Sequence, residues 1–83
     1  MTSMSSVWSY MERRGARYGI ELKDMLSKTP SSILDDPNEL LKFWRNKDIS
    51  HIYPIDTHPE LQGDPNNWFP EDIEENRSRN QKG

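Results

Sequence analysis

The sequence predicts an α+β fold in which short helices precede a C-terminal strand–loop–strand–helix unit. Up to residue 47, apolar residues recur at helical spacing. After Lys47 the chain alternates between apolar and polar side chains and is rich in β-branched and aromatic residues, which is typical of strands. We therefore divide the chain into a helical N-terminal arm, residues 1–47, and a second unit, residues 48–83. Together they form one small domain, because 83 residues are too few for two.

The first helix of the arm is expected to begin at a cap formed by Ser5 or Ser6, whose hydroxyl groups can accept a hydrogen bond from the first turn. It runs to about Arg14, and Gly15 is expected to stop it. Residues 1–4, before the cap, are expected to be frayed. The apolar side of this helix follows helical spacing and consists of Val7, Trp8 and Met11.

Two further helices are expected in the arm. One covers residues 20–28 and is ended by Pro30. The other begins at Asp36-Pro37, because aspartate is a good cap acceptor and proline needs no N–H partner in the first turn. This helix runs to about Asn46 and buries an apolar side that consists of Leu40, Leu41 and Trp44.

The second unit opens with a predicted strand over residues 48–54, which alternates in polarity and is stopped by a proline. Residues 55–67 are rich in proline, glycine, aspartate and asparagine and are expected to form a loop. Residues 68–69 are a short second strand at most. The polar segment that follows is expected to be a helix over residues 73–81, with glutamates in its first turn.

The composition excludes several kinds of site and protein. The chain has no cysteine, which excludes disulfide bridges and thiolate zinc sites, so a metal would have to be held by His, Asp, Glu or Asn. No apolar run is long enough for a membrane helix, and the N-terminus does not resemble a signal peptide. We therefore expect a cytoplasmic protein without a membrane partner. Its apolar content of 31% allows only a thin core.

The net charge of −3 is unevenly distributed along the chain. Residues 1–47 carry 8 basic and 6 acidic side chains, whereas residues 48–83 carry 3 basic and 8 acidic ones. An acidic chain is a poor binder of nucleic acid by charge alone. The basic residues nevertheless form two small clusters, which are either solvated helix faces or phosphate contacts. The clusters are Arg13, Arg14 and Arg17 in the arm, and Arg77, Arg79 and Lys82 near the end of the chain.

One set of polar residues in the second unit has the spacing of a functional site. His51 lies in the predicted strand, Asn67 ends the loop, and Asn76 and Asn80 lie on the predicted helix. Residues 76 and 80 are four positions apart, so both project from one helix face. If this face packs on the end of the strand, an imidazole and two amide oxygens meet at one point.

The segment that carries this spacing, DISHIYP…GDPNNWFPEDIEENRSRNQKG, resembles an HNH endonuclease of the ββα-metal class. The resemblance covers residues 48–83, and the small size is similar to that of phage-type members. It implies that the chain hydrolyses DNA phosphodiester bonds with one divalent metal ion. The roles that it implies are a general base for His51, an orienting role for Asn67, metal ligation for Asn76 and Asn80, and phosphate contacts for Arg77 or Arg79.

The chain departs from the family pattern at the residue before the base. Family members usually have Asp or His there as a metal ligand, whereas this chain has Ser50. The carboxylate of Asp48 can reach a metal through water, and His58 in the loop is either a further metal or phosphate contact or an exposed loop residue. A site with these oxygen donors favours Mg²⁺ or Mn²⁺ over Zn²⁺.

Three functions are compatible with the sequence. The first is a small HNH-type nuclease that acts on DNA. The second is a catalytically weakened protein of the same fold that binds DNA or protein. The third is an unrelated interaction protein, in which the N-terminal helices bind a partner or a second copy of the chain through Trp8, Trp44 and their neighbours.

Overall fold

Four α-helices and one two-stranded antiparallel sheet make up the computed structural model, which describes residues 2–80 and the side chains of residues 2–78. In chain order the elements are α1 (Met4–Ala16), α2 (Leu22–Ser27), α3 (Pro37–Arg45), β1 (Lys47–His51), β2 (Trp68–Asp72) and α4 (Ile73–Asn80). Short 3-10 turns at Ser31–Ile33 and Pro59–Leu61 interrupt the loops. The structure confirms the predicted α+β class and the order of helices, hairpin and final helix.

Helix α1 starts earlier than predicted. Ser3 is the cap, because its Oγ accepts a hydrogen bond from the Ser6 N–H at 3.2 Å, and the helix begins at Met4. The predicted apolar side is only partly correct. Val7 and Met11 are buried, whereas Trp8 is 41% exposed, because it lies about 100° round the helix axis from Val7.

Gly15 does not stop α1, which continues through Ala16. It is buried because the helix passes close to the following segment: a Cβ atom at this position would lie 2.7 Å from the Ile20 carbonyl oxygen. The turn after the helix is made by Gly19, whose φ of +70° suits glycine. Gly15 therefore permits packing, and Gly19 ends the turn.

The other two helices of the arm follow the prediction more closely. Helix α3 is capped as predicted, with Asp36 Oδ1 accepting hydrogen bonds from the N–H groups of Asn38 and Glu39 at 3.1 and 3.2 Å. Helix α2 is shorter than the predicted 20–28, because Ile20 bonds back to α1 and Glu21 is extended. The arm is thus three helices, as expected, with corrected ends.

The core joins the arm to the hairpin. Its buried apolar side chains are Val7, Met11, Ile20, Met25, Leu40, Trp44 and Trp68. All but Trp68 come from the arm, so this residue of β2 inserts the hairpin into the helical core. Trp44 is fully buried and donates from Nε1 to Thr29 Oγ1 at 3.0 Å. Of the two tryptophans considered for partner binding, only Trp8 is on the surface. Leu41, which was expected to be buried on α3, is half-buried.

The hairpin pairs β1 with β2 in a register that sets Asp48 opposite Glu71 and His51 opposite Trp68. The predicted strand over residues 48–54 is too long, and the predicted strand over 68–69 is too short. Strand β1 ends at His51. One more backbone bond follows, from the Ile52 N–H to the Asn67 carbonyl at 2.8 Å, and the Tyr53 N–H then donates to the side chain of Asn67. At the other end, pairing continues through Pro70 to Asp72, because both strands of a two-stranded sheet are edge strands, and an edge strand tolerates proline.

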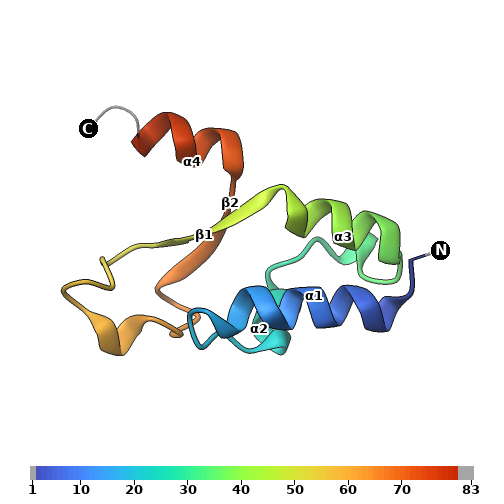
Figure 1. Cartoon of the computed structure of the whole chain (residues 1–83), viewed down its shortest axis with the longest axis horizontal. Coiled ribbons are helices and arrows are strands. Elements are labelled where there is room, and N and C mark those ends of the chain that lie inside the picture. Colours follow the sequence, from blue (N-terminus) through green and yellow to red (C-terminus); the bar gives the residue numbers. More distant parts are fainter. Residues whose placement is uncertain (1, 81–83) are drawn as a thin grey trace.

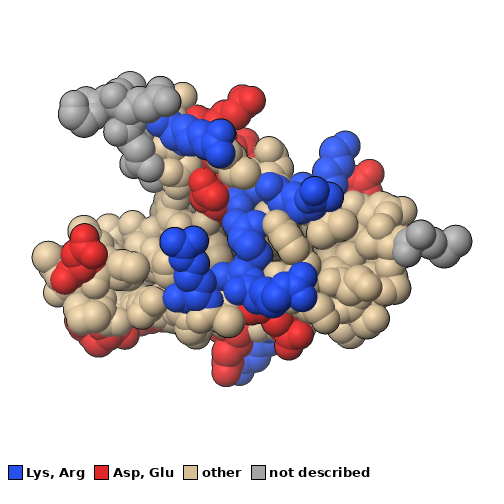
Figure 2. Space-filling model, in the orientation of Figure 1, with Lys and Arg blue, Asp and Glu red and all other residues tan. Residues whose placement is uncertain are grey.

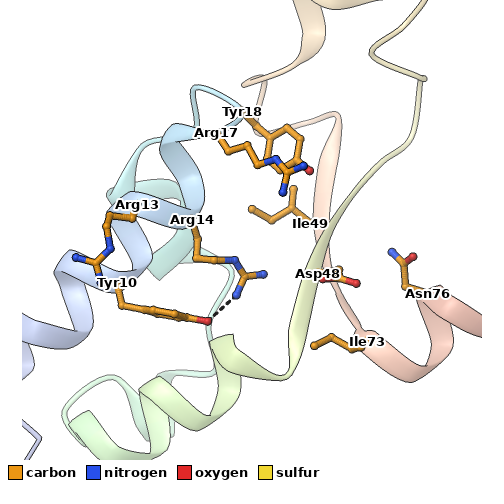
Figure 3. Close-up of a pocket in the computed structure, with 9 residues that line it drawn as sticks. All are labelled: Tyr10, Arg13, Arg14, Arg17, Tyr18, Asp48, Ile49, Ile73 and Asn76. Carbon is orange, nitrogen blue, oxygen red and sulfur yellow. Dashed lines mark hydrogen bonds between the residues drawn. The ribbon is translucent and has the colours of Figure 1, made fainter.

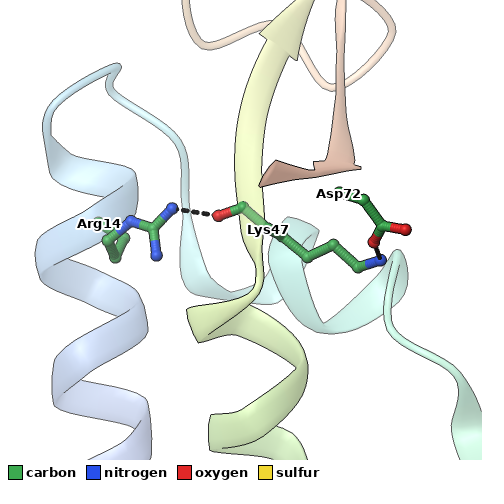
Figure 4. A network of polar contacts seen from close by, with 3 residues as sticks. All are labelled: Arg14, Lys47 and Asp72. Carbon is green, nitrogen blue, oxygen red and sulfur yellow. Dashed lines mark hydrogen bonds and ion pairs between the residues drawn. The ribbon is translucent and has the colours of Figure 1, made fainter. Parts of the chain in front are cut away.

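Helix α4 leaves the end of β2 and, among the described residues, packs against β1 and β2 alone. Figure 1 shows it on the side of the hairpin away from α1 and α3. At the base of the hairpin, Lys47 and Asp72 form an ion pair, and the Lys47 carbonyl accepts a hydrogen bond from Arg14 of α1 (Figure 4). No helix in the described part of the chain is long and apolar enough to cross a membrane.

Candidate functional site

The hairpin presents two chemically different faces. Side chains alternate along a strand, so Asp48 and Ser50 lie on one face of β1 and Ile49 and His51 on the other. Glu71 is directly opposite Asp48 and therefore shares its face. Helix α4 covers this acidic face, while the other face meets the helical core.

His51 is half-buried on the core face at the end of β1. Its Nε2 lies 2.9 Å from the carbonyl oxygen of Gln62, and its ring makes an edge contact with Tyr18 at 5.0 Å between centroids. A carbonyl oxygen can only accept, so Nε2 must carry the hydrogen of this bond. In the neutral ring the proton acceptor is then Nδ1. The loop carbonyl thus selects one tautomer of His51.

Asn67 holds the loop that supplies this carbonyl. It is 3% exposed, and its Oδ1 accepts a hydrogen bond from the Tyr53 N–H at 2.8 Å. Its Nδ2 donates to the carbonyl oxygens of Tyr53 and Leu61, both at 3.2 Å. Gln62 follows Leu61 directly, so Asn67 fixes the segment that binds His51. The side chain of Asn67 is therefore placed to orient His51 through the loop backbone.

A chain of hydrogen bonds joins α4 to the acidic face of the hairpin. The Ser50 hydroxyl donates to Glu71 Oε1 at 2.7 Å and accepts from Asn76 Nδ2 at 2.9 Å. Because Ser50 has one hydroxyl hydrogen, the bond to Glu71 requires Asn76 to be the donor. Glu71 was not singled out from the sequence. Had the second strand been extended beyond Phe69, alternation would have placed Glu71 on this face.

The predicted meeting of His51 with the helix amides is only partly observed. Asn76 contacts Ser50, the chain neighbour of His51, but adjacent strand residues point to opposite faces, so the His51 ring and Asn76 leave β1 in different directions. His58 binds Thr57 Oγ1 through Nδ1 at 2.8 Å and lies beside the Tyr53 ring, within the loop. Arg77 is exposed on α4. The side chains of Arg79 and Asn80 lie outside the described residues.

A cleft with a volume of about 570 Å³ lies along the outer edge of β1, between α1 and α4. Figure 3 shows Arg13, Arg14 and Arg17 on the α1 wall and Asp48 and Asn76 on the other. Tyr18 also lines the cleft. His51 contacts the Tyr18 ring but does not itself line the cleft. The cleft therefore has one cationic wall and one wall of carboxylate and amide groups.

The acidic face supplies hard oxygen donors. Within the part of the chain that the structure describes, no group of three or more His, Cys, Asp or Glu side chains is arranged to hold a metal ion. Two carboxylates, those of Asp48 and Glu71, stand opposite each other, and Asn76 adds an amide group beside Ser50. Carboxylate and amide oxygens suit Mg²⁺ or Mn²⁺, so the donor types fit the expected ion.

Comparison with known proteins adds no assignment: no protein-family model, no curated protein and no solved structure matches the chain.

Proposed function

We propose that the chain is a small HNH-type endonuclease that hydrolyses DNA phosphodiester bonds, with His51 as general base and one divalent metal ion. One observation carries the proposal: Asn67 donates to the Leu61 carbonyl, and the carbonyl of the next residue, Gln62, accepts from Nε2 of His51 and so holds one tautomer of its ring. This leaves Nδ1 as the proton acceptor, one residue from the contact between the hairpin and α4. What supports the proposal is that a histidine, a loop asparagine and an oxygen-donor face follow one another along hairpin, loop and helix in the order that the resemblance implies. The His51 ring itself lies on the core face, opposite the oxygen donors.

The proposed roles follow from these contacts. His51 Nδ1 takes the proton of the attacking water, and the bond from Nε2 to the Gln62 carbonyl strengthens as the imidazole becomes positively charged. Asn67 holds that carbonyl in place throughout. A divalent cation, when bound, would neutralise charge on the phosphate. Asp48, Glu71 and Asn76 are the described residues that would hold it, with Asn80 as a further ligand and Arg77 or Arg79 as phosphate contacts.

Nicking of supercoiled plasmid DNA tests the proposal. With Mg²⁺ or Mn²⁺ the parent protein should nick the plasmid, and Zn²⁺ should support the reaction less well. His51→Ala should reduce the rate by about 10²–10⁴-fold, because general-base catalysis contributes about that much. The chain has one other histidine, so His58→Ala is the matched variant and should lose less activity. An equal rate for His51→Ala and the parent would show that His51 has only a structural role.

A second candidate is a protein of the same fold that binds DNA without cutting it. The observation that favours it is the bond at Ser50: Asn76 presents its N–H group, not its oxygen, at the position where the family has a ligand. This candidate predicts DNA binding with no nicking in any of the three metals. Binding of a protein partner or a second copy would use the exposed Trp8 of α1.

A further inference from the structure

Two arginines of α1, Arg13 and Arg14, and its C-cap residue Arg17 have two different roles. Arg14 is partly buried and donates to Tyr10 Oη, to the Trp44 carbonyl and to the Lys47 carbonyl, so it joins α1 to α3 and β1. Arg13 and Arg17 are exposed and line the cleft. Arg17 is the C-cap of α1 and keeps a helical backbone, so it lies about one turn beyond Arg13, with its guanidinium over the Tyr18 ring. Arg14 is therefore structural, whereas Arg13 and Arg17 face outward.

The charges of Arg13 and Arg17 are not balanced by carboxylates. Among the described residues, neither guanidinium forms an ion pair, although the chain carries a net charge of −3. Like charges at this spacing on a helix repel each other. Figure 2 shows Lys and Arg side chains gathered in a band across the middle of this face of the protein. Figure 3 shows the Arg13 side chain beside Tyr10 and the Arg17 side chain beside Tyr18, so each guanidinium would bind a separate anionic group.

The shape and lining of the cleft indicate which anion fits. A membrane surface is flat and would not enter a cleft, and an acidic peptide would meet Asp48 on the opposite wall. The phosphate backbone of DNA can meet both walls, because its phosphates pair with guanidinium groups, and the divalent cation of the proposed function, held by Asp48, would neutralise charge on a phosphate at the other wall.

We propose that Arg13 and Arg17 of α1 form a binding site for the phosphate backbone of DNA, so that the N-terminal arm holds the substrate against the outer edge of β1. The proposal rests on the proposed function for the identity of the ligand, but binding at this wall requires no catalysis. It extends the DNA contacts beyond residues 48–83, the segment that resembles a nuclease.

Fluorescence anisotropy with a labelled DNA duplex in EDTA measures this binding without cleavage. The test variants are Arg13→Gln, Arg17→Gln and the double variant. The matched control is Lys23→Gln/Lys42→Gln, which removes the same charge from exposed helix positions that do not line the cleft. Each lost phosphate contact should lower the steepness of log K against log salt by about 0.9, and affinity at 0.15 M salt by about fivefold. The double variant should therefore lose about 25-fold, and the control should retain the parent slope.

Two further measurements complete the test. The pair Arg13→Lys/Arg17→Lys keeps both charges and should keep the parent salt slope. A double glutamine variant that binds like the control, or a parent protein that does not bind DNA, would overturn the proposal. Failure of the proposed function would give a different result. If the parent protein binds DNA through these arginines but never nicks plasmid DNA, the binding-site proposal stands and the nuclease proposal is wrong.

Discussion

Replacement of Asn67 by alanine tests how the loop is held. The side chain of Asn67 makes three hydrogen bonds, one from the Tyr53 N–H and two to the carbonyl oxygens of Tyr53 and Leu61. Each such bond contributes about 1 kcal/mol net to stability. The variant should therefore lose about 3 kcal/mol, and more where the abandoned backbone groups remain buried. A chain of 83 residues is expected to have a free energy of unfolding of about 4–12 kcal/mol in total.

Urea unfolding, followed by tryptophan fluorescence, measures the effect, because Trp44 and Trp68 are buried in the core. With a urea dependence of about 1–3 kcal/mol per M, a loss of 3 kcal/mol lowers the midpoint by about 1–3 M. The neighbouring Asn66 is exposed, so Asn66→Ala is the matched control. It should change stability by less than about 0.5 kcal/mol.

The same variant tests whether Asn67 orients His51. Nitrogen NMR of the imidazole should show the Nε2–H tautomer in the parent and in Asn66→Ala, since the Gln62 carbonyl accepts from Nε2. In Asn67→Ala the released loop should allow both tautomers. Equal stability of the two alanine variants, or an unchanged tautomer in Asn67→Ala, would refute the argument that this amide fixes the loop and, through it, His51.

Two further predictions concern the contacts on either side of β1. Arg14→Gln should lower the free energy of unfolding by about 2–4 kcal/mol, because the charged guanidinium of Arg14 donates three hydrogen bonds. Arg13→Gln should change it by less than about 0.5 kcal/mol. Similar urea midpoints for the two variants would contradict this. In EDTA, Ser50→Asp should be less stable than the parent, because the new carboxylate adjoins Glu71. Mn²⁺ at about 100 times its Kd should raise the free energy of unfolding of this variant by about 2.7 kcal/mol. Thermal unfolding with and without Mn²⁺ measures this, and an equal response of Ser50→Asn would contradict it.

Local signals in the sequence were sufficient for the elements whose ends depend on their own residues. Asp36 and Pro37 set the start of α3 by capping and by the fixed proline φ, and neither needs a distant partner. The ends of α1 and β1 depend on tertiary contacts instead. Gly15 has the residue type of a helix stop, but its role is set by the approach of Ile20. After the end of β1, the side chain of Asn67 replaces a backbone partner for the Tyr53 N–H.

The same distinction applies to the candidate site. The spacing of His51, Asn67 and Asn76 predicted that strand, loop and helix would meet at one point. In the structure Asn67 binds the Leu61 carbonyl beside the residue that contacts His51, whereas Asn76 contacts Ser50 on the opposite face of β1. The carbonyl of Gln62 was not predictable, because every residue has one and only the loop path selects it. Glu71 was missed because the second strand was taken as too short, which hid its position opposite Asp48.

The position of Glu71 changes the meaning of Ser50. In the sequence alone, Ser50 was a departure from the nuclease family that the segment resembles, whose members usually have an acidic or histidine ligand there. In the folded hairpin the Ser50 hydroxyl donates to a carboxylate from the paired strand, and Asp48 stands opposite that same carboxylate. The face that α4 covers therefore has carboxylates without one at position 50: Glu71 comes from β2, and Asp48 comes from β1. A ligand set is defined by the side chains that meet in space, so under the proposed function the cation would depend on Asp48 and Glu71 rather than on the residue at position 50.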